Sequence, residues 1–230
     1  MTAGISSSRV NHALFEGNPF VKARSLVLAV MLVATAACGR KELVDGGVYI
    51  TRSVCPQVGV PAATGDVTLF DPAGYTTAAA IDVVATITNV RPTCDETGSQ
   101  ILSTATFDVV ATRRDAGPAR TVVLPYFDVA MQGGTQVVAK RIGNVALKFP
   151  AGSQRASTSG QAAIRVSRAA TSLPEAVRDK LTRERKSGEV EAAIDPMTDP
   201  AVRAAVARAT FEHLIGFQLT ATQLQYNATR

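Results

Sequence analysis

Tryptophan is absent from this sequence and other aromatic residues are scarce, since aromatic side chains make up 5% of its 230 residues. Proteins that bind single-stranded nucleic acids stack bases on aromatic rings, and sugar-cleaving enzymes commonly use rings in the same way. Such a platform is hard to assemble here, so the composition argues against a glycosidase and against nucleic-acid binding. Hydrophobic residues still reach 46%, which is enough for a folded core.

Histidine is almost as rare, because the chain has only His12 and His213. His12 falls in the segment that we interpret below as a targeting signal, which leaves His213 for the exported protein. A single histidine nearly removes Ser-His-Asp and Cys-His catalysis and all metal sites with several histidines. We expect His213 to be a partly buried structural residue in a helix, beside Glu212 and Leu214.

Carboxylates alone remain as possible catalytic groups. Five carboxylates are candidates for a carboxylate-based hydrolase: Asp71, Asp95, Glu96, Asp108 and Asp128. No G-x-S-x-G elbow, Walker loop or dinucleotide fingerprint occurs where strand, turn and helix would support it, and the serine-rich stretch 157–160 lacks the first glycine of the elbow. We predict no catalytic residues, no cofactor and no metal, and therefore a protein that is not an enzyme.

The charge balance is mildly basic. The formal net charge is +5, but the residues before Cys38 hold three basic residues and one acidic residue, which leaves +3 for the remainder. The basic run 178–186 contains Asp179 and Glu184, as expected for a solvated helix face. We predict no nucleic-acid partner.

A targeting segment begins the chain. Lys22 and Arg24 supply positive charge, and an apolar run from Ser25 to Ala37 ends in small side chains. This is the order of a secretory signal peptide, and the run is shorter than the roughly 18 to 20 residues of a membrane-spanning helix. We predict a signal peptide over 1–37. Translation beginning at Val21 would give a conventional short n-region, and the position of the true start is left open.

The sequence Thr35-Ala36-Ala37-Cys38 resembles the lipobox of bacterial lipoproteins, although Thr35 stands where that family usually has leucine. The resemblance implies a diacylglyceryl group on Cys38, cleavage by signal peptidase II and a lipidated tether over 38–46. The residue after the cysteine is Gly39 and not aspartate. In this family that implies sorting to the outer membrane of a Gram-negative host, with the protein on the periplasmic face. The alternative is an ordinary signal peptide with Cys38 incidental.

Cys55 and Cys94 remain as an even pair after Cys38 is acylated. Exported proteins enter an oxidising compartment, where such a pair forms a disulfide. Closing this loop would stabilise the fold by about 3 to 4 kcal/mol in the chain-entropy model. The alternative is two buried thiols.

The segment 47–171 has short strand-like stretches separated by turn residues. We expect strands near 47–55, 66–70, 79–91, 101–114, 121–131, 135–149 and 160–169. This spacing predicts a mainly β domain, an antiparallel immunoglobulin-like sandwich of about seven strands. Alternation of apolar and polar residues supports two of them, with the inward residues Ile81, Val83, Ala85, Ile87, Ala105, Phe107, Val109 and Ala111.

Local features predict how some of these strands are arranged. The turn 132–135 contains Gly133 and Gly134 and predicts a hairpin. Pro125 lacks a backbone donor and predicts an edge or bulged strand. Gly143 suggests a bulge that turns Arg141 outward, and Arg141 as an anion site is the alternative. We expect a loop over 151–160.

A helical segment is expected over 172–230. Leu173-Pro174-Glu175 predicts a helix that runs to about residue 186, and Asp199-Pro200 predicts a longer one to Phe217, with aspartate as N-cap. Thr220 and Gln223 form a capping-box pattern for a last short helix. The longer helix either docks on the sandwich or binds a partner through Val202, Val206, Phe211, Leu214 and Ile215.

These observations predict an envelope lipoprotein attached to a membrane through acylated Cys38. We expect a non-enzymatic structural, assembly or protein-binding role with an envelope protein as partner. The alternative is a periplasmic binding module for a small ligand or cell-wall fragment. A carboxylate-based hydrolase is less favoured.

Overall fold

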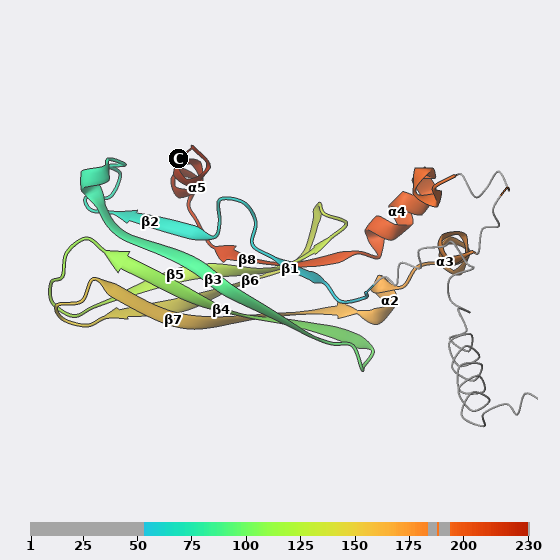
Figure 1. Ribbon diagram of the computed structural model, residues 1–230, viewed down its shortest axis with the longest axis horizontal. Helices are drawn as coiled ribbons and strands as arrows, with labels where there is room; N and C mark the ends of the chain where they lie inside the picture. The colour runs from blue at the N-terminus through green and yellow to red at the C-terminus, as the bar shows by residue number, and fades with distance from the viewer. Residues whose placement is uncertain (1–52, 184–187, 189–193, 230) are drawn as a thin grey trace, which may run out of the picture. The chain divides into compact units, whose positions relative to one another are not determined.

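The computed structural model describes residues 53–183, 188 and 194–229. Their fold is mainly β and consists of two four-stranded sheets with the orders β1-β8-β5-β6 and β2-β3-β4-β7 (Figure 1). All neighbouring strands are antiparallel except β1 and β8. The strands are β1 (Gln57–Gly59), β2 (Asp66–Phe70), β3 (Ile81–Asp95), β4 (Gln100–Arg113), β5 (Arg120–Gln132), β6 (Gln136–Phe149), β7 (Arg155–Ser167) and β8 (Phe211–Phe217).

Short helices complete the described chain. They are η1 (Ala78–Ala80), α2 (Arg168–Thr171), α3 (Glu175–Thr182), η3 (Pro196–Thr198), α4 (Pro200–Arg208) and α5 (Ala221–Thr229). Most of them follow β7, as expected for the C-terminal segment. The expected strand over 47–55 lies largely outside the described residues, and 53–55 are not in a strand.

Alternating side chains build the core, as predicted. Val83, Ala85, Phe107 and Val109 are completely buried, and they belong to one cluster with Leu147 of β6 and residues of β5 and β8. The two sheets therefore pack face to face through the faces that the period-two pattern identified. A smaller cluster lies around Ile101, Ile164 and Phe211.

The strand β7 begins at Arg155, so the prediction of a loop over 151–160 is wrong for most of its length. Residues 155–160 pair with β4 even though they are mainly small and polar. Gly160 explains part of this composition, because a Cβ at this position would overlap the ring of Phe107. Small residues here leave room for a large side chain from the neighbouring strand.

The predicted hairpin turn is confirmed. Gln132 pairs with Gln136 at the end of the β5–β6 ladder, and Gly133 and Gly134 have φ values of 63° and 74°. Glycine adopts these positive values without steric cost.

The edge position predicted from Pro125 is wrong, because β5 lies between β8 and β6. Pro125 pairs with Asn144, and its carbonyl accepts a hydrogen bond from the Gln218 N–H at 2.9 Å. Its main-chain groups therefore face the side where β8 has just ended at Phe217. The missing donor removes no hydrogen bond to β6, which is why an interior strand tolerates proline.

The bulge predicted at Gly143 is also absent, since the β5–β6 register shifts between Ala130 and Met131 instead. Gly143 faces Tyr126 across the ladder, and a Cβ on Gly143 would overlap the tyrosine ring. Gly143 therefore leaves room for the ring of Tyr126 on the neighbouring strand β5. Arg141 is exposed without the help of a bulge.

The C-terminal segment is helical only in part. The α3 and α4 helices begin where predicted, and the side chain of Asp199 caps α4 by accepting from the Ala201 N–H at 2.8 Å. The α4 helix ends at Arg208, so the predicted helix to Phe217 is wrong over its second half. Residues 211–217 form β8, because their apolar side chains alternate to one face and the backbone pairs with β5 and β1.

The partner-binding helix is consequently overturned. Val202 is buried on α4, while Phe211 and Ile215 are buried on β8. Val206 and Leu214 are partly buried, the first on α4 and the second on β8. The five predicted residues therefore lie on two elements of different kinds.

The last helix, α5, covers one edge of the β2 sheet. Its predicted capping box is present, since Thr220 Oγ accepts from the Gln223 N–H at 3.2 Å and Gln223 Oε1 accepts from the Thr220 N–H at 2.9 Å. The side-chain amide of Asn227 donates to the carbonyls of Ala63 and Asp66 at 2.9 and 2.7 Å. These bonds fix α5 beside the β2 strand.

The predicted disulfide between Cys55 and Cys94 is confirmed, which removes the alternative of two thiols. It joins the chain just before β1 to the end of β3, and so links the two sheets covalently near β1.

Candidate functional site

The most distinctive polar feature of the described chain is a buried row of three side chains between the sheets. Ser103 Oγ lies 2.9 Å from His213 Nδ1, and His213 Nε2 lies 3.0 Å from Asp128 Oδ1. Ser103 comes from β4, whereas His213 and Asp128 come from β8 and β5 of the other sheet. The row therefore connects the two sheets through the core.

The location of these side chains decides what they can do. Ser103, His213 and Asp128 are 1%, 0% and 6% exposed. A Ser-His-Asp row is the arrangement of a hydrolase triad, but a nucleophile must reach a substrate carbonyl. A hydroxyl that is 1% exposed cannot do so, and the row is therefore a polar link between the sheets.

Sequence reasoning did not find this row. The prediction that His213 lies in a helix beside Glu212 is wrong, because His213 is an inward residue of β8. The alternation of Phe211, His213 and Ile215 with Glu212 and Leu214 was the available signal.

The buried carboxylate of Asp128 ends the row beside β7. Its Oδ2 accepts a hydrogen bond from the Ala163 N–H of β7 at 3.0 Å. Burial raises the pKa of Asp128, but the hydrogen bonds from His213 and Ala163, together with electrostatic interactions that include the charge of Arg141, lower it more, and the net pKa lies below the ordinary value. Asp128 therefore stays ionised and holds the free edge of β7 against the other sheet.

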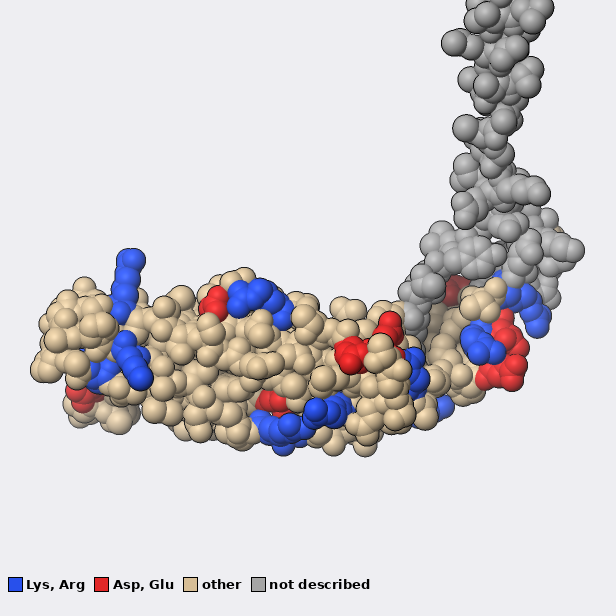
Figure 2. All heavy atoms as spheres, turned by 90° about the horizontal axis from the view of Figure 1, so that it is seen from below, with Lys and Arg blue, Asp and Glu red and all other residues tan. Residues whose placement is uncertain are grey.

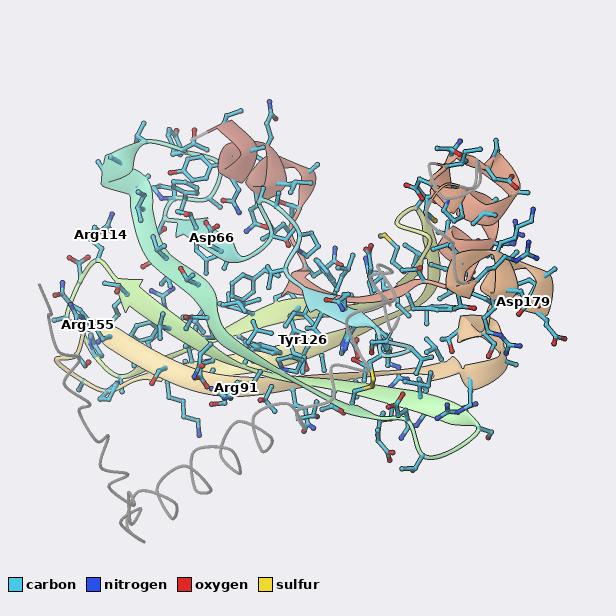
Figure 3. All side chains as sticks on the ribbon, turned by 45° about the vertical axis from the view of Figure 1, so that its right-hand side comes forward. Asp66, Arg91, Arg114, Tyr126, Arg155 and Asp179 are labelled. Atoms are coloured by element: carbon cyan, nitrogen blue, oxygen red, sulfur yellow. A yellow bond between two sulfur atoms is a disulfide. The ribbon has the colours of Figure 1, made fainter. Side chains whose placement is uncertain are left out.

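A groove of about 410 Å³ opens beside Asp128. It is lined by Tyr126, Asp128, Arg141, Ile142, Gly143, Gln161, Ala162 and Ala163. The Tyr126 hydroxyl donates to the Gln161 carbonyl at 2.7 Å, and burial raises the pKa of this hydroxyl. In Figure 3, Tyr126 lies along the middle of the strands, whereas Arg155 lies where β7 begins.

The groove marks a side of the domain that we call the open side, defined by strands β6 and β7. In the described part of the chain, β6 pairs only with β5, and β7 pairs only with β4. Both strands are therefore the outer strands of their sheets. They are long, with 14 and 13 residues.

Charge is distributed unevenly on the open side. Residues 129–174 contain six basic residues and no acidic one: Lys140, Arg141, Lys148, Arg155, Arg165 and Arg168. The five that lie on β6 and β7 are exposed. On the face shown in Figure 2, charged side chains form small separate groups on a largely uncharged surface. An excess of one sign is therefore a local property of the two outer strands.

The remaining carboxylates have structural positions. Asp71 follows β2 and Glu96 follows β3, both exposed. Asp95 accepts from Thr97 two residues later. Asp108 accepts from Asn89, Arg91 and Ser159, and these bonds lower its pKa to about 2. Two of the candidates border a hollow in the described surface: Asp128 lines the groove above, and Asp71 lines a separate pocket of about 250 Å³ with Pro72 and Tyr75.

Among the residues that the structure describes, no three His, Cys, Asp or Glu side chains are placed to hold a metal ion. No helix within this part of the chain has the length and apolarity needed to cross a membrane. Cys38, the signal peptide and the tether lie outside the described residues.

Comparison with known proteins adds no assignment. No family model matches the chain, and neither curated proteins nor solved structures give a match.

Proposed function

We propose that this chain is a lipoprotein of the bacterial cell envelope that binds a protein partner and is not an enzyme. Its anchor is the acylated Cys38, on the periplasmic face of the outer membrane of a Gram-negative cell. Support for export comes from the signal peptide pattern and from the Cys55–Cys94 disulfide, which is characteristic of an oxidising compartment.

The observation that carries the protein-binding role is the open side. Outer strands present unpaired N–H and C=O groups, to which another polypeptide can add a strand. Two long outer strands lie on the same side, and Tyr126 and Asp128 bind carbonyl and N–H groups of β7 across it. Membrane anchoring raises the effective concentration of this side near other envelope proteins.

A second candidate role is binding of a small ligand or cell-wall fragment in the groove beside Asp128. The specific observation in its favour is the combination of Arg141 and the Tyr126 hydroxyl at one opening. Asp128, the acidic side chain that lines the groove, already has two hydrogen-bond partners within the protein and is therefore less available to a ligand. The protein-binding role is therefore preferred, and nucleic acid is not proposed as a partner.

We also propose that the domain is immunoglobulin-like. In that fold, strands B and E are neighbours in one sheet, and C and F are neighbours in the other. Here β4 and β7 pair in one sheet and β5 and β8 pair in the other, and the chain order is also β4, β5, β7, β8. The Ser103–His213 hydrogen bond then joins the strands that a disulfide joins in antibody domains.

The anchor is tested by the intact mass of the protein extracted from membranes, compared with a Cys38→Ala variant. We expect a species that begins at Cys38, carries acyl mass and alkylates at two further cysteines only after reduction. A soluble, unmodified species in wild-type cells would overturn the anchor.

A further inference from the structure

The outer strand β6 combines three properties that are found together at strand-addition sites. It is unpaired on one side, it is exposed on both faces over residues 136–142, and in this stretch Lys140 and Arg141 stand among apolar side chains. We propose that β6 is the docking strand for an extended, acidic polypeptide segment of the partner. This proposal rests on the protein-binding part of the proposed function and names its surface and its partner chemistry.

The backbone of β6 defines which groups would bind. Pro125 directs its carbonyl towards the β8 side and pairs with Asn144 across the β5–β6 ladder. In an antiparallel pair, two facing residues either both direct their N–H and C=O groups towards each other or both direct them away from each other. Asn144 therefore points its N–H and C=O away from β5, and Ile142 and Lys140 do the same. These three residues form the hydrogen-bonding edge for an incoming strand.

The side chains define the chemistry of the partner. Val138 and Ile142 are 44% and 51% exposed and lie on the same face as Lys140, while Arg141 lines the groove on the other face. Lys140 Nζ lies 5.9 Å from the centre of the Phe127 ring. An incoming strand would place side chains beside these residues on both faces. Acidic residues alternating with apolar residues would match them.

Charge also decides between possible occupants. A second copy pairing antiparallel through β6 would bring Lys140 and Arg141 close to the same residues of the other copy. Like charges directly opposite one another destabilise strand pairing, and lysine on an outer strand is a common protection against self-association. Asp128 faces Arg141 across the β5–β6 ladder, but residues 129–174 contain no acidic residue that could offset Lys140 and its copy in such a pair. An acidic segment from another protein is therefore favoured over a second copy.

The decisive measurement is amide hydrogen exchange on the full chain in detergent, with a ten-residue peptide of alternating aspartate and valine as probe. We expect the peptide to slow exchange at Lys140, Ile142 and Asn144, while the intervening amides, which already bond to β5, change little. The same peptide with lysine in place of aspartate should bind at least about tenfold more weakly. Equal binding of both peptides, or protection elsewhere only, would overturn the proposal.

Two variants separate backbone pairing from charge. Ile142→Pro removes an outward N–H without removing a β5–β6 hydrogen bond and should weaken peptide binding about tenfold. Ser157→Pro is the matched control, because it changes the outer edge of β7 in the same way and should leave binding unchanged. The double variant Lys140→Glu with Arg141→Glu should weaken the acidic peptide and strengthen the basic one. Melting temperatures check that each variant folds.

Other occupants are distinguished by their own outcomes. Protection of the same amides that grows with protein concentration alone would identify a second copy and overturn the acidic partner. Binding of phosphatidylglycerol vesicles without binding of the acidic peptide would identify a lipid surface.

A photo-crosslinking residue at Ile142 in intact membranes is compared with one at Val110, which is exposed on an interior strand. Crosslinks from Val110 alone leave the protein-binding role standing and refute β6, whereas none from either site refutes both.

Discussion

The two sides of the pair of sheets differ in the length and the protection of their outer strands. On one side, which we call the closed side, the outer strands β1 and β2 have three and five residues. The α5 helix is fixed beside β2, and the disulfide fixes the chain before β1. On the open side, β6 and β7 are more than twice as long, and neither pairs with a further strand among the described residues. Short or covered edges prevent association, so this difference is the reason for placing the proposed partner on the open side.

Removing the disulfide should have the largest effect, because it releases the closed side. The double variant Cys55→Ala with Cys94→Ala should lower the free energy of unfolding by about 2 to 5 kcal/mol. Urea unfolding measures this change, and wild-type protein in reducing agent is the control. An unchanged midpoint would mean that the closed side does not depend on this link.

Removing Asp128 should destabilise the open side, because this buried carboxylate holds β7 against the other sheet. Asp128→Ala leaves His213 and the Ala163 N–H without their acceptor, and about 3 kcal/mol of stability should be lost. Exchange at Ala163 should become faster at the same time. Asp71→Ala, an exposed carboxylate after β2, is the control and should change stability by less than about 0.5 kcal/mol.

Gly143→Ala tests whether the tyrosine contact of the open side needs a glycine. The new methyl group would overlap the Tyr126 ring and displace its hydroxyl from Gln161, at a cost of about 1 to 3 kcal/mol. Differential scanning calorimetry measures the loss. The neighbouring outward variant Asn144→Ala should be close to neutral, and an equal loss in both would refute the ring-over-glycine explanation.

Asn227→Ala should uncover the edge of β2 with a smaller loss of stability. Two hydrogen bonds to the Ala63 and Asp66 carbonyls disappear, worth about 1 to 2 kcal/mol together. Faster amide exchange in β2, with little change in β6, would confirm that α5 protects only the closed side. Gln225→Ala on the exposed part of the same helix is the matched control.

The smallest effect concerns pH. The pKa of Asp108 is lowered from 3.8 to about 2, first by the hydrogen bond from Arg91 and then by those from Asn89 and Ser159. A lowered folded-state pKa stabilises the fold above the unfolded value and loses that stabilisation as pH falls from about 4 towards 2. Asp108→Asn should therefore flatten this part of the stability curve measured by urea unfolding. Curves of equal slope for both proteins would contradict the role of this cluster.

The sequence patterns predicted those parts of the fold that depend on neighbours along the chain. Period-two alternation identified the inward faces around Val83 and Phe107, and caps at Asp199 and Thr220 began the helices where the structure has them. Hairpin geometry followed from Gly133 and Gly134 in the same way. Each of these features is decided within a few residues.

The errors concern features decided by distant residues. Pro125 is tolerated inside a sheet because β8, about ninety residues later in the chain, ends beside it. The β8 strand was predicted as helix because the preceding α4 pattern continued into it, and only pairing with β5 decides otherwise. The row Ser103, His213 and Asp128 spans sequence separations of 110 and 85 residues. Local alternation can place His213 on an inward face, but it cannot show that these three side chains meet.

The disulfide also determines how a pulling force would enter the domain. In the anchored protein that we propose, tension from the membrane reaches the folded residues along the chain that leads to Cys55. Without the link, that tension would peel the three-residue strand β1 away from β8, one hydrogen bond after another. With the link, it passes at Cys94 into β3, a strand of 15 residues paired along its length with β4. Many hydrogen bonds then resist together, and the open side keeps its shape while its tether is stretched.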